Sequence, residues 1–263
     1  MITVEQADRI ILENCKEFPI VEKPLHETLG AVLREDIKAD RDIPSFNKAL
    51  MDGIAIPFSS HAKGQRCFVI QGTQAAGQKA INLKDEGNCV EIMTGAIVPQ
   101  RCDCVIPIED VEIKDGEAFI KENVLVRSLQ NIRFEGADNK KGDVLLKKGK
   151  ILSSVDIGIC SYVGKSRVKV SYAPKVAIVS TGNELVDIDV RKLEPFQIRP
   201  SNAYALQAAC RMNSFFQSAI FHVKDDKRIL TKKIKFILKK FDVIIVSGGI
   251  SMGKFDYVPE VLK

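Results

Sequence analysis

The chain has 263 residues, 45% of them apolar, and a formal net charge of +5. This length supplies one large domain or two to three small ones. No apolar run approaches the roughly 20 residues of a membrane span, and no basic-then-apolar leader is visible at the N-terminus, so we expect a cytoplasmic protein with no membrane segment.

Neither the cysteines nor the lysines indicate a metal or nucleic-acid site. The seven cysteines are scattered, and the one close pair, Cys102 and Cys104, lacks the second ligand pair of a zinc site. Five lysines between Lys232 and Lys240 fall on the polar side of an amphipathic helix, and a solvated helix face is the simplest interpretation. No nucleic-acid-binding module or aromatic interleaving accompanies them, so we expect no nucleic-acid partner.

The N-terminal residues predict a capped amphipathic helix followed by extended chain. Thr3 and Gln6 have the spacing of a capping box. The apolar residues that follow fall on one helical face: Val4, Ala7, Ile10 and Ile11. Pro19 and Pro24 end the helix and lead into extended structure, and the polar linker Asp40–Pro44 closes this part of the chain.

Residues 45–146 have the texture of a compact β-rich domain, in which short β-forming runs alternate with turns of Gly, Asn and Asp. After this domain, Ser154–Val163 predicts a helix that Gly164 ends. Because mixed texture precedes and follows the β-rich part, we expect residues 1–44 and 147–173 to form one mixed domain that is interrupted by an insertion.

Residues 174–263 predict an incomplete parallel α/β domain, so that the fold class as a whole is α/β and multidomain. The expected elements are a strand at Lys175–Ser180, a helix at Ala203–Met212 capped by Ser201 and Asn202, a strand at Phe215–Val223, a basic helix opened by Asp225 and Asp226, and a strand at Val243–Val246. The continuous apolar run of the last strand predicts burial on both faces of the sheet.

Two glycine-containing turns follow the first and third of these strands, at Ser180–Glu184 and Ser247–Ser251. Because the carboxyl ends of parallel strands lie along one edge, the two loops should face a common crevice. Turns without bulky side chains let successive backbone N–H groups converge on an anion. Together with Glu184 and Asp256, the loops predict a phosphate-bearing ligand held with Mg²⁺; the alternative is that each is only a tight strand-to-helix turn.

Short motifs follow one another along the whole chain: Ile43-Pro44 with Met51–Gly53, Ile92–Ala96, Asn131–Asp143, Ser180–Leu185, Ile198–Asn202 and Ser247–Tyr257. Read together and in this order, they resemble the MoeA-type molybdopterin molybdenumtransferases, a family that includes the gephyrin E domain. The resemblance implies that the last domain has the molybdopterin-binding, MogA-like fold. It also implies insertion of molybdate into adenylylated molybdopterin, coupled to Mg²⁺-dependent hydrolysis that releases AMP.

The resemblance further implies a homodimer, supplied with substrate by a molybdopterin adenylyltransferase. Each cleft would combine the α/β domain of one subunit with the linker and β-domain motifs of the other. Carried over position by position, the catalytic residues would be Asp52, Thr94 and Asp138 across the interface, with Glu184, Asp225 and Asp256 as acids of the α/β domain and candidate metal ligands. Pterin-phosphate binding would fall to Ser247, Gly248, Gly249 and Ser251, together with Ser180, Thr181 and Gly182 of the other loop.

The sequence departs from the family pattern at Ala49, Asn183, Phe196 and Pro200, where a hydroxyl, Asp, Gly and Asp respectively are common. The family continues past Lys263 with the rest of the α/β domain and a small β-barrel, so we expect this chain to be a piece of a longer enzyme that is inactive by itself and binds ligand weakly at best. Two other functions stay open. One is a non-catalytic scaffold on the same fold, and the other is a hydrolase of the CinA type, which would account for the SGG loop but not for Met51–Gly53.

Overall fold

The computed structural model describes residues 2–251, 253 and 256–262; Met252 of the predicted phosphate-loop motif and Lys263 of the predicted third domain lie outside the described residues. The contacts divide the chain into two compact units. Unit 1 comprises Met1–Asp36 and Leu146–Lys263, and unit 2 comprises Ile37–Leu145. Unit 2 thus starts before the predicted insertion 45–146. Among the described helices, none is long and apolar enough to cross a membrane.

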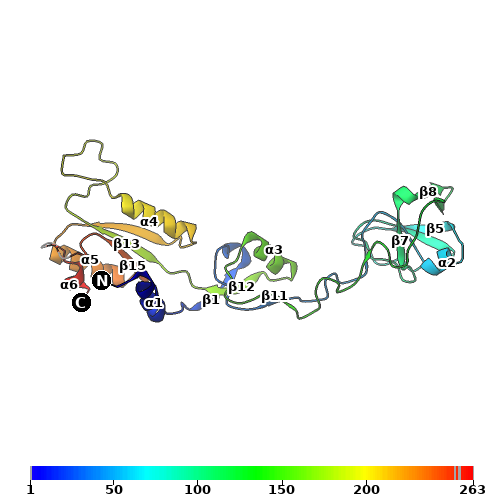
Figure 1. Ribbon diagram of the computed structural model, residues 1–263, viewed down its shortest axis with the longest axis horizontal. Helices are drawn as coiled ribbons and strands as arrows, with labels where there is room; N and C mark the ends of the chain where they lie inside the picture. The colour runs from blue at the N-terminus through cyan, green and yellow to red at the C-terminus, as the bar shows by residue number, and fades with distance from the viewer. Residues whose placement is uncertain (1, 252, 254–255, 263) are drawn as a thin grey trace. The chain divides into compact units, whose positions relative to one another are not determined.

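Unit 1 contains most of the helices and the three-stranded parallel sheet, and Figure 1 labels several of its elements. Its elements are α1 (Val4–Asn14), β1 (Ile20–Pro24), η1 (Leu25–Glu27), α3 (Ser154–Tyr162), β12 (Arg167–Ser171), β13 (Val176–Thr181), α4 (Ser201–Met212), β14 (Ser218–Val223), α5 (Lys227–Leu238), β15 (Val243–Ser247) and α6 (Val258–Val261).

Residues 37–146 contain most of the antiparallel strands. Their elements are β2 (Ile37–Lys38), β3 (Lys48–Ala49), β4 (Gly53–Ile56), α2 (Phe58–Ala62), β5 (Cys67–Gln74), β6 (Asn88–Ile92), β7 (Cys104–Pro107), η2 (Ile108–Asp110), β8 (Val111–Lys114), β9 (Glu117–Ile120), β10 (Ile132–Arg133) and β11 (Val144–Leu146).

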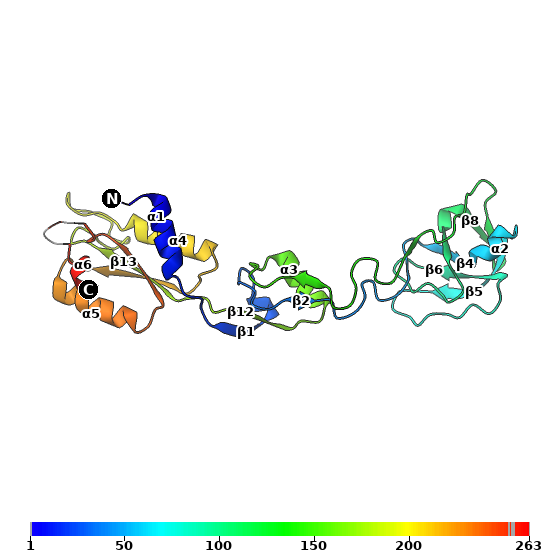
Figure 2. The same cartoon turned by 60° about the horizontal axis from the view of Figure 1, so that its bottom comes forward.

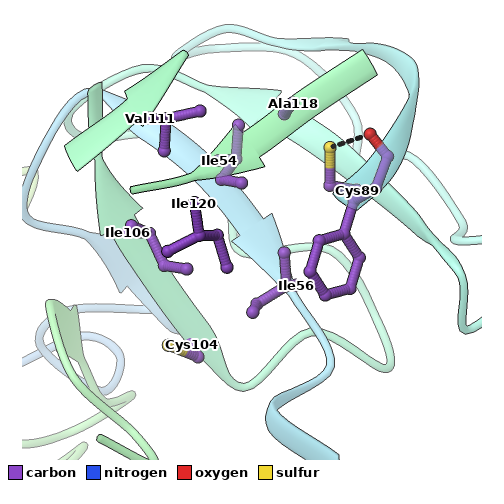
Figure 3. Packing of buried hydrophobic residues seen from close by; sticks show 9 residues of the cluster. Ile54, Ile56, Cys89, Cys104, Ile106, Val111, Ala118 and Ile120 are labelled. Carbon is purple, nitrogen blue, oxygen red and sulfur yellow. Dashed lines mark hydrogen bonds between the residues drawn. The ribbon is translucent and has the colours of Figure 1, made fainter. Parts of the chain in front are cut away.

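The predicted β-rich part of the chain contains a six-stranded sheet in the order β7-β4-β6-β5-β9-β8. Every residue of β4 is buried, because its alternating side chains enter two different cores. Ile54 and Ile56 join one core and Ala55 joins the other. Figure 3 shows the first core, in which side chains of β4, β7, β8 and β9 point toward one another. The prediction of a β-rich fold in this part of the chain is therefore confirmed, and the sheet has a core on each side of β4.

The predicted helix starts are confirmed by their hydrogen bonds. At α1, the Gln6 N–H donates to Thr3 Oγ1 (3.2 Å) and the Thr3 N–H donates to Gln6 Oε1 (2.9 Å). At α3, Ser153 and Asp156 form the same reciprocal box, and Gly164 follows the helix with φ +76°. A positive φ costs glycine little, which explains why this helix ends there.

Asp156 at the start of α3 carries more than a capping role. It is 2% exposed, and its carboxylate lies 2.7 Å from Lys150 Nζ. Ser153 donates to the same carboxylate from its backbone N–H (2.9 Å) and its hydroxyl (2.7 Å). Hydrogen bonds from Lys150 and then from Ser153 lower the pKa of Asp156 from its ordinary 3.8 to about 2. The charged form of this buried group is therefore the stable one.

We expect Asp156→Asn to reduce the free energy of unfolding at pH 7 by about 1 to 3 kcal/mol, the range for a hydrogen bond to a charged group. A depressed pKa stabilises the fold above pH 3.8, and this stabilisation disappears as the pH falls toward about 2. Denaturant unfolding of both proteins between pH 7 and pH 2, followed by far-UV circular dichroism, should show the two curves converging below pH 4. A constant difference over that range would contradict this account.

The α/β part of unit 1 is a parallel sheet in the order β14-β13-β15. All six residues of β13 are buried, because helices cover both faces of this central strand. Leu230, Ile234 and Ile237 of α5 pack on one face. Ala203 and Cys210 of α4 pack on the other, and the two helices lie on opposite sides of the strands in Figure 1 and Figure 2.

Two expectations for this part are wrong in detail. The run Val243–Val246 was expected to be buried on both faces, but every residue of β15 is half-buried, because β15 has one sheet neighbour among the described strands and β13 occupies the centre. Ser201 and Asn202 were expected to cap α4, but both lie inside it and Pro200 precedes the helix without a side-chain cap. The fixed φ of proline suits a helix start, so the helix begins directly after it.

Candidate functional site

The loops after β13 and β15 line one cavity, as the parallel topology predicts. The cavity has a volume of about 250 Å³. Ser180, Thr181 and Glu184 line it from the first loop, and Ser247 and Gly248 line it from the second. These two segments are far apart in sequence, and adjacent pairing of β13 with β15 brings their carboxyl ends together. The expectation of a common crevice is therefore confirmed.

Thr181 is the most unusual residue of this cavity. The residue is 6% exposed, and its Oγ1 has no hydrogen-bond partner within the described part of the chain. A Cβ added to Gly249 would lie 2.6 Å from that oxygen, so the hydroxyl lies directly against the glycine turn. Burying a hydroxyl without a partner costs about 1 to 3 kcal/mol. Because Thr181 also lines the cavity, this unsatisfied hydroxyl lies at the candidate ligand site.

Gly248 and Gly249 are required by both space and backbone conformation. Their φ angles are +92° and +62°, a region that side chains disfavour. A Cβ on Gly248 would lie 2.6 Å from the carbonyl oxygen of Thr181. The turn can therefore pack closely on β13 only because neither residue has a side chain.

The acids of this region have different roles. Glu184 lines the cavity, and a Cβ on Gly182 would lie 2.6 Å from its carboxylate. Asp225 instead accepts a hydrogen bond from the Asn183 N–H (3.2 Å), while Asn183 Oδ1 accepts one from the Asp225 N–H (3.3 Å). Asp256 accepts a hydrogen bond from the Gly253 N–H (3.0 Å). Two of the three acids therefore hold backbone in place.

The predicted metal ligands Glu184, Asp225 and Asp256 do not form a cage. In the portion of the chain that the structure describes, no group of three or more His, Cys, Asp or Glu side chains could hold a metal ion. Mg²⁺ is commonly held by one or two carboxylates together with phosphate oxygens of the substrate. The cavity residues fit that arrangement, with Glu184 as the protein carboxylate.

The remaining predicted residues, Asp52, Thr94 and Asp138, belong to unit 2. Thr94 donates to Asp52 Oδ1 from both its hydroxyl and its N–H, at 2.6 Å each. These bonds, the hydroxyl first, lower the pKa of Asp52 and keep it ionised. Asp138 pairs with Arg133, whose Nε lies 3.0 Å from Asp138 Oδ1.

Both pairs of unit 2 are attached to the short strand β3. Arg133 lies on β10, which pairs with β3, and the Gly95 N–H next to Thr94 donates to the Ala49 oxygen at 2.9 Å. Hydrogen-bonded backbone thus connects the Asp52 pair and the Asp138 pair within unit 2.

Residues 2–164 match the protein family described as "MoeA N-terminal region (domain I and II)". The chain belongs to the MoeA family. Residues 177–263 match the family described as "Probable molybdopterin binding domain". The CinA-type alternative would account for the α/β part alone, so the first match argues against it.

Other members of the MoeA family and their solved structures resemble the chain over nearly all of its length. A molybdopterin molybdenumtransferase of Synechocystis is 37% identical over 99% of this chain and 67% of its own length. A molybdopterin molybdenumtransferase of Staphylococcus epidermidis is 33% identical over 100% of this chain and 63% of its own length. Two crystal structures of the molybdopterin biosynthesis MoeA protein of Pyrococcus horikoshii have TM-scores of 0.77 and 0.82, at 30% and 28% identity. They cover 100% and 94% of this chain, which spans 66% of each.

The cavity of this MoeA-family chain also contains residues that the predicted site omitted. Arg199 lines it from the segment before α4, and Ser201 and Asn202 line it from the first turn of α4. Their signal in the sequence was the motif Ile198–Asn202, which was part of the resemblance but was assigned no ligand role. Ser251, in contrast, was predicted to bind phosphate and is exposed outside the set of cavity residues.

Proposed function

We propose that this chain acts in molybdenum cofactor biosynthesis, at the step in which molybdate is inserted into adenylylated molybdopterin. The observation that carries the proposal is the cavity between the two glycine loops, with the unpartnered Thr181 hydroxyl beneath one of them. The chain spans 67% and 63% of the length of two relatives named molybdopterin molybdenumtransferase, and this similarity supports the proposal.

In this proposal the cavity residues bind and orient a phosphate-bearing substrate. The Ser247–Gly249 turn presents backbone N–H groups to the phosphate, and the Thr181 hydroxyl gains the partner that it otherwise lacks. Arg199 also lines this cavity, and its guanidinium donates hydrogen bonds to the backbone oxygens of Val190 and Arg191. Glu184 would hold Mg²⁺ at this cavity, where the ion would supply positive charge for the hydrolysis that releases AMP.

Asp225 and Asp256 act as positioning residues in this scheme. Asp225 fixes the loop at Asn183, and Asp256 fixes the chain at Gly253. We further propose that Asp52, Thr94 and Asp138 act at the cleft of a second copy in a cytoplasmic homodimer, and that a molybdopterin adenylyltransferase supplies the substrate. The lowered pKa of Asp52 suits a carboxylate that stays charged at neutral pH.

Isothermal titration of the 263-residue chain with AMP and with molybdate, with and without Mg²⁺, tests the proposal. We expect AMP to bind in the cavity and Mg²⁺ to strengthen its binding. Expression of the chain in a bacterial strain that lacks its molybdenumtransferase would then test cofactor formation. If the chain binds neither AMP nor molybdate in either condition, the scaffold alternative is favoured instead.

We expect Glu184→Gln to remove most of the Mg²⁺ enhancement of AMP binding, so that its affinity with Mg²⁺ falls about tenfold, toward the metal-free value. Glu194→Gln is the matched control, because Glu194 is exposed on the same long segment before α4 and lies outside the cavity lining. The control should keep the full enhancement. Equal effects of both variants would show that net charge, and not the position of Glu184, controls the metal dependence.

A further inference from the structure

The outer face of α5 combines lysines with exposed apolar side chains. Helical spacing places one stripe on this face: Ile229, Lys232, Lys233, Phe236 and Lys240. Ile229 is 51% exposed and Phe236 is 43% exposed, whereas the core-facing stripe of the same helix is buried. The sequence predicted a solvated basic face here. The structure shows instead that two large apolar residues share that face with the lysines.

These side chains line a groove with the end of β14. Its volume is about 540 Å³, and it is lined by His222 and Val223 of β14 together with Ile229, Lys232, Lys233 and Phe236 of α5. Lys233 Nζ lies 4.8 Å from the centroid of the Phe221 ring, and Lys240 Nζ lies 4.9 Å from that of Phe236. Contacts of this kind hold ammonium groups over aromatic faces, which fixes the charges at the groove before any partner arrives.

The charge around the groove is of one sign. Residues 227–240 include seven Lys or Arg and no Asp or Glu. Lys227 pairs with Glu260 at 2.6 Å, but within the described residues no salt bridge involves the other six basic side chains. Positive charge that is not neutralised by an acidic side chain, next to exposed apolar surface, is complementary to a negatively charged segment that carries an apolar side chain.

We propose that this groove docks an acidic segment of a partner protein, with one aromatic or aliphatic side chain of the segment seated between Ile229 and Phe236. The groove shares no lining residue with the phosphate cavity, so the proposal is independent of the chemistry proposed there. Its anchor pocket would give specificity, and the surrounding lysines would accelerate and orient the encounter.

The composition of the groove favours an acidic peptide over other polyanions. Nucleic-acid sites typically use arginine and stacking aromatic side chains, whereas this groove contains lysines and a single lining phenylalanine. A membrane-binding helix inserts its apolar residues into the lipid boundary. Here the ammonium groups of Lys233 (5.7 Å) and Lys240 lie beside the Phe236 ring on the same face of the helix, so apolar and basic side chains are not separated onto different faces.

The test is fluorescence anisotropy of the full 263-residue chain with a labelled twelve-residue peptide of Glu and Asp that has one central Phe. We expect saturable binding that weakens at least tenfold when the Phe of the peptide is replaced by Ala. In the protein, the double variant Lys232→Gln/Lys233→Gln should bind the Phe-containing peptide at least tenfold more weakly than the parent chain does. Lys235→Gln with Lys239→Gln is the matched control, since it removes the same charge from the same helix outside the groove and should retain binding within about threefold.

Competition distinguishes the other partners. A single-stranded DNA oligomer and vesicles with phosphatidylserine should displace the peptide only weakly and irrespective of the Lys232 and Lys233 substitutions. Equal losses in the two double variants, no effect of the peptide Phe, or tighter binding of DNA or vesicles that depends on Lys232 and Lys233 would each overturn the proposal. Circular dichroism of every variant confirms that α5 is folded, as expected for substitutions at surface lysines.

Discussion

Thr181→Val is expected to weaken AMP binding at least tenfold without lowering the stability of the fold. The hydroxyl is buried and has no partner within the described chain, so valine removes a polar group that the folded protein does not satisfy. The free energy of unfolding should therefore stay constant or rise by about 1 kcal/mol. A hydrogen bond to a charged phosphate contributes about 1.5 to 3 kcal/mol, which corresponds to a loss of tenfold or more in affinity.

Ser218→Ala provides the matched control for this experiment. Ser218 Oγ is the second buried side-chain oxygen without a partner in the described residues, and it lies on β14 of the same sheet, outside the cavity lining. Its removal should likewise preserve or raise stability, but AMP should bind as before. Titration calorimetry and denaturant unfolding of both variants separate the two effects. Unchanged AMP affinity in Thr181→Val would show that the hydroxyl is merely a packing feature.

Gly249→Ala is expected to abolish AMP binding and to destabilise the fold by about 1 to 2 kcal/mol, the cost of a left-handed backbone for a residue with a Cβ. The new Cβ would lie 2.6 Å from Thr181 Oγ1 and 3.2 Å from Val258 Cγ2, at a φ of +62°. The turn packs directly on β13, so the substitution affects stability as well as ligand binding.

A double-mutant cycle with Thr181→Ala measures the two contributions separately. Removing the Thr181 side chain relieves the contact with the new methyl group, so Gly249→Ala should destabilise Thr181→Ala less than it destabilises the parent protein. The backbone cost at φ +62° should remain in both backgrounds. If the two single effects simply add, the methyl group does not contact Thr181, and the close approach of the turn to β13 is wrong.

Local patterns in the sequence were sufficient to predict many elements. Two helix caps illustrate this: the capping box at Thr3 and Gln6, and the Asp226 cap of α5. In each, the donor and the acceptor lie within three residues of each other, so the local sequence is sufficient to predict the hydrogen bond. The common edge for the loops after β13 and β15 followed from one further assumption, that the strands are parallel. The family motifs include most of the residues that line the cavity, but only five of the eleven were assigned a role at the site.

Burial and pairing between distant residues were decided only by the tertiary structure. The apolar runs of β13 and β15 look alike in the sequence, yet β13 is central and β15 is half-buried, since strand order depends on pairing with segments tens of residues away. Leu238 at the end of α5 is 61% exposed, whereas its apolar neighbour Ile237 is buried.

Two features have the same origin: the Thr181 hydroxyl has no hydrogen-bond partner among the described residues, and the pKa of Asp156 is lowered. Each depends on which groups surround one atom in space: the Gly248-Gly249 turn over Thr181, and Lys150 beside Asp156. The sequence determined which chemical groups are available to this protein. Packing determined which of them lost water, which gained a partner and which were left for a ligand, because those energies depend on distances that the order of residues does not specify.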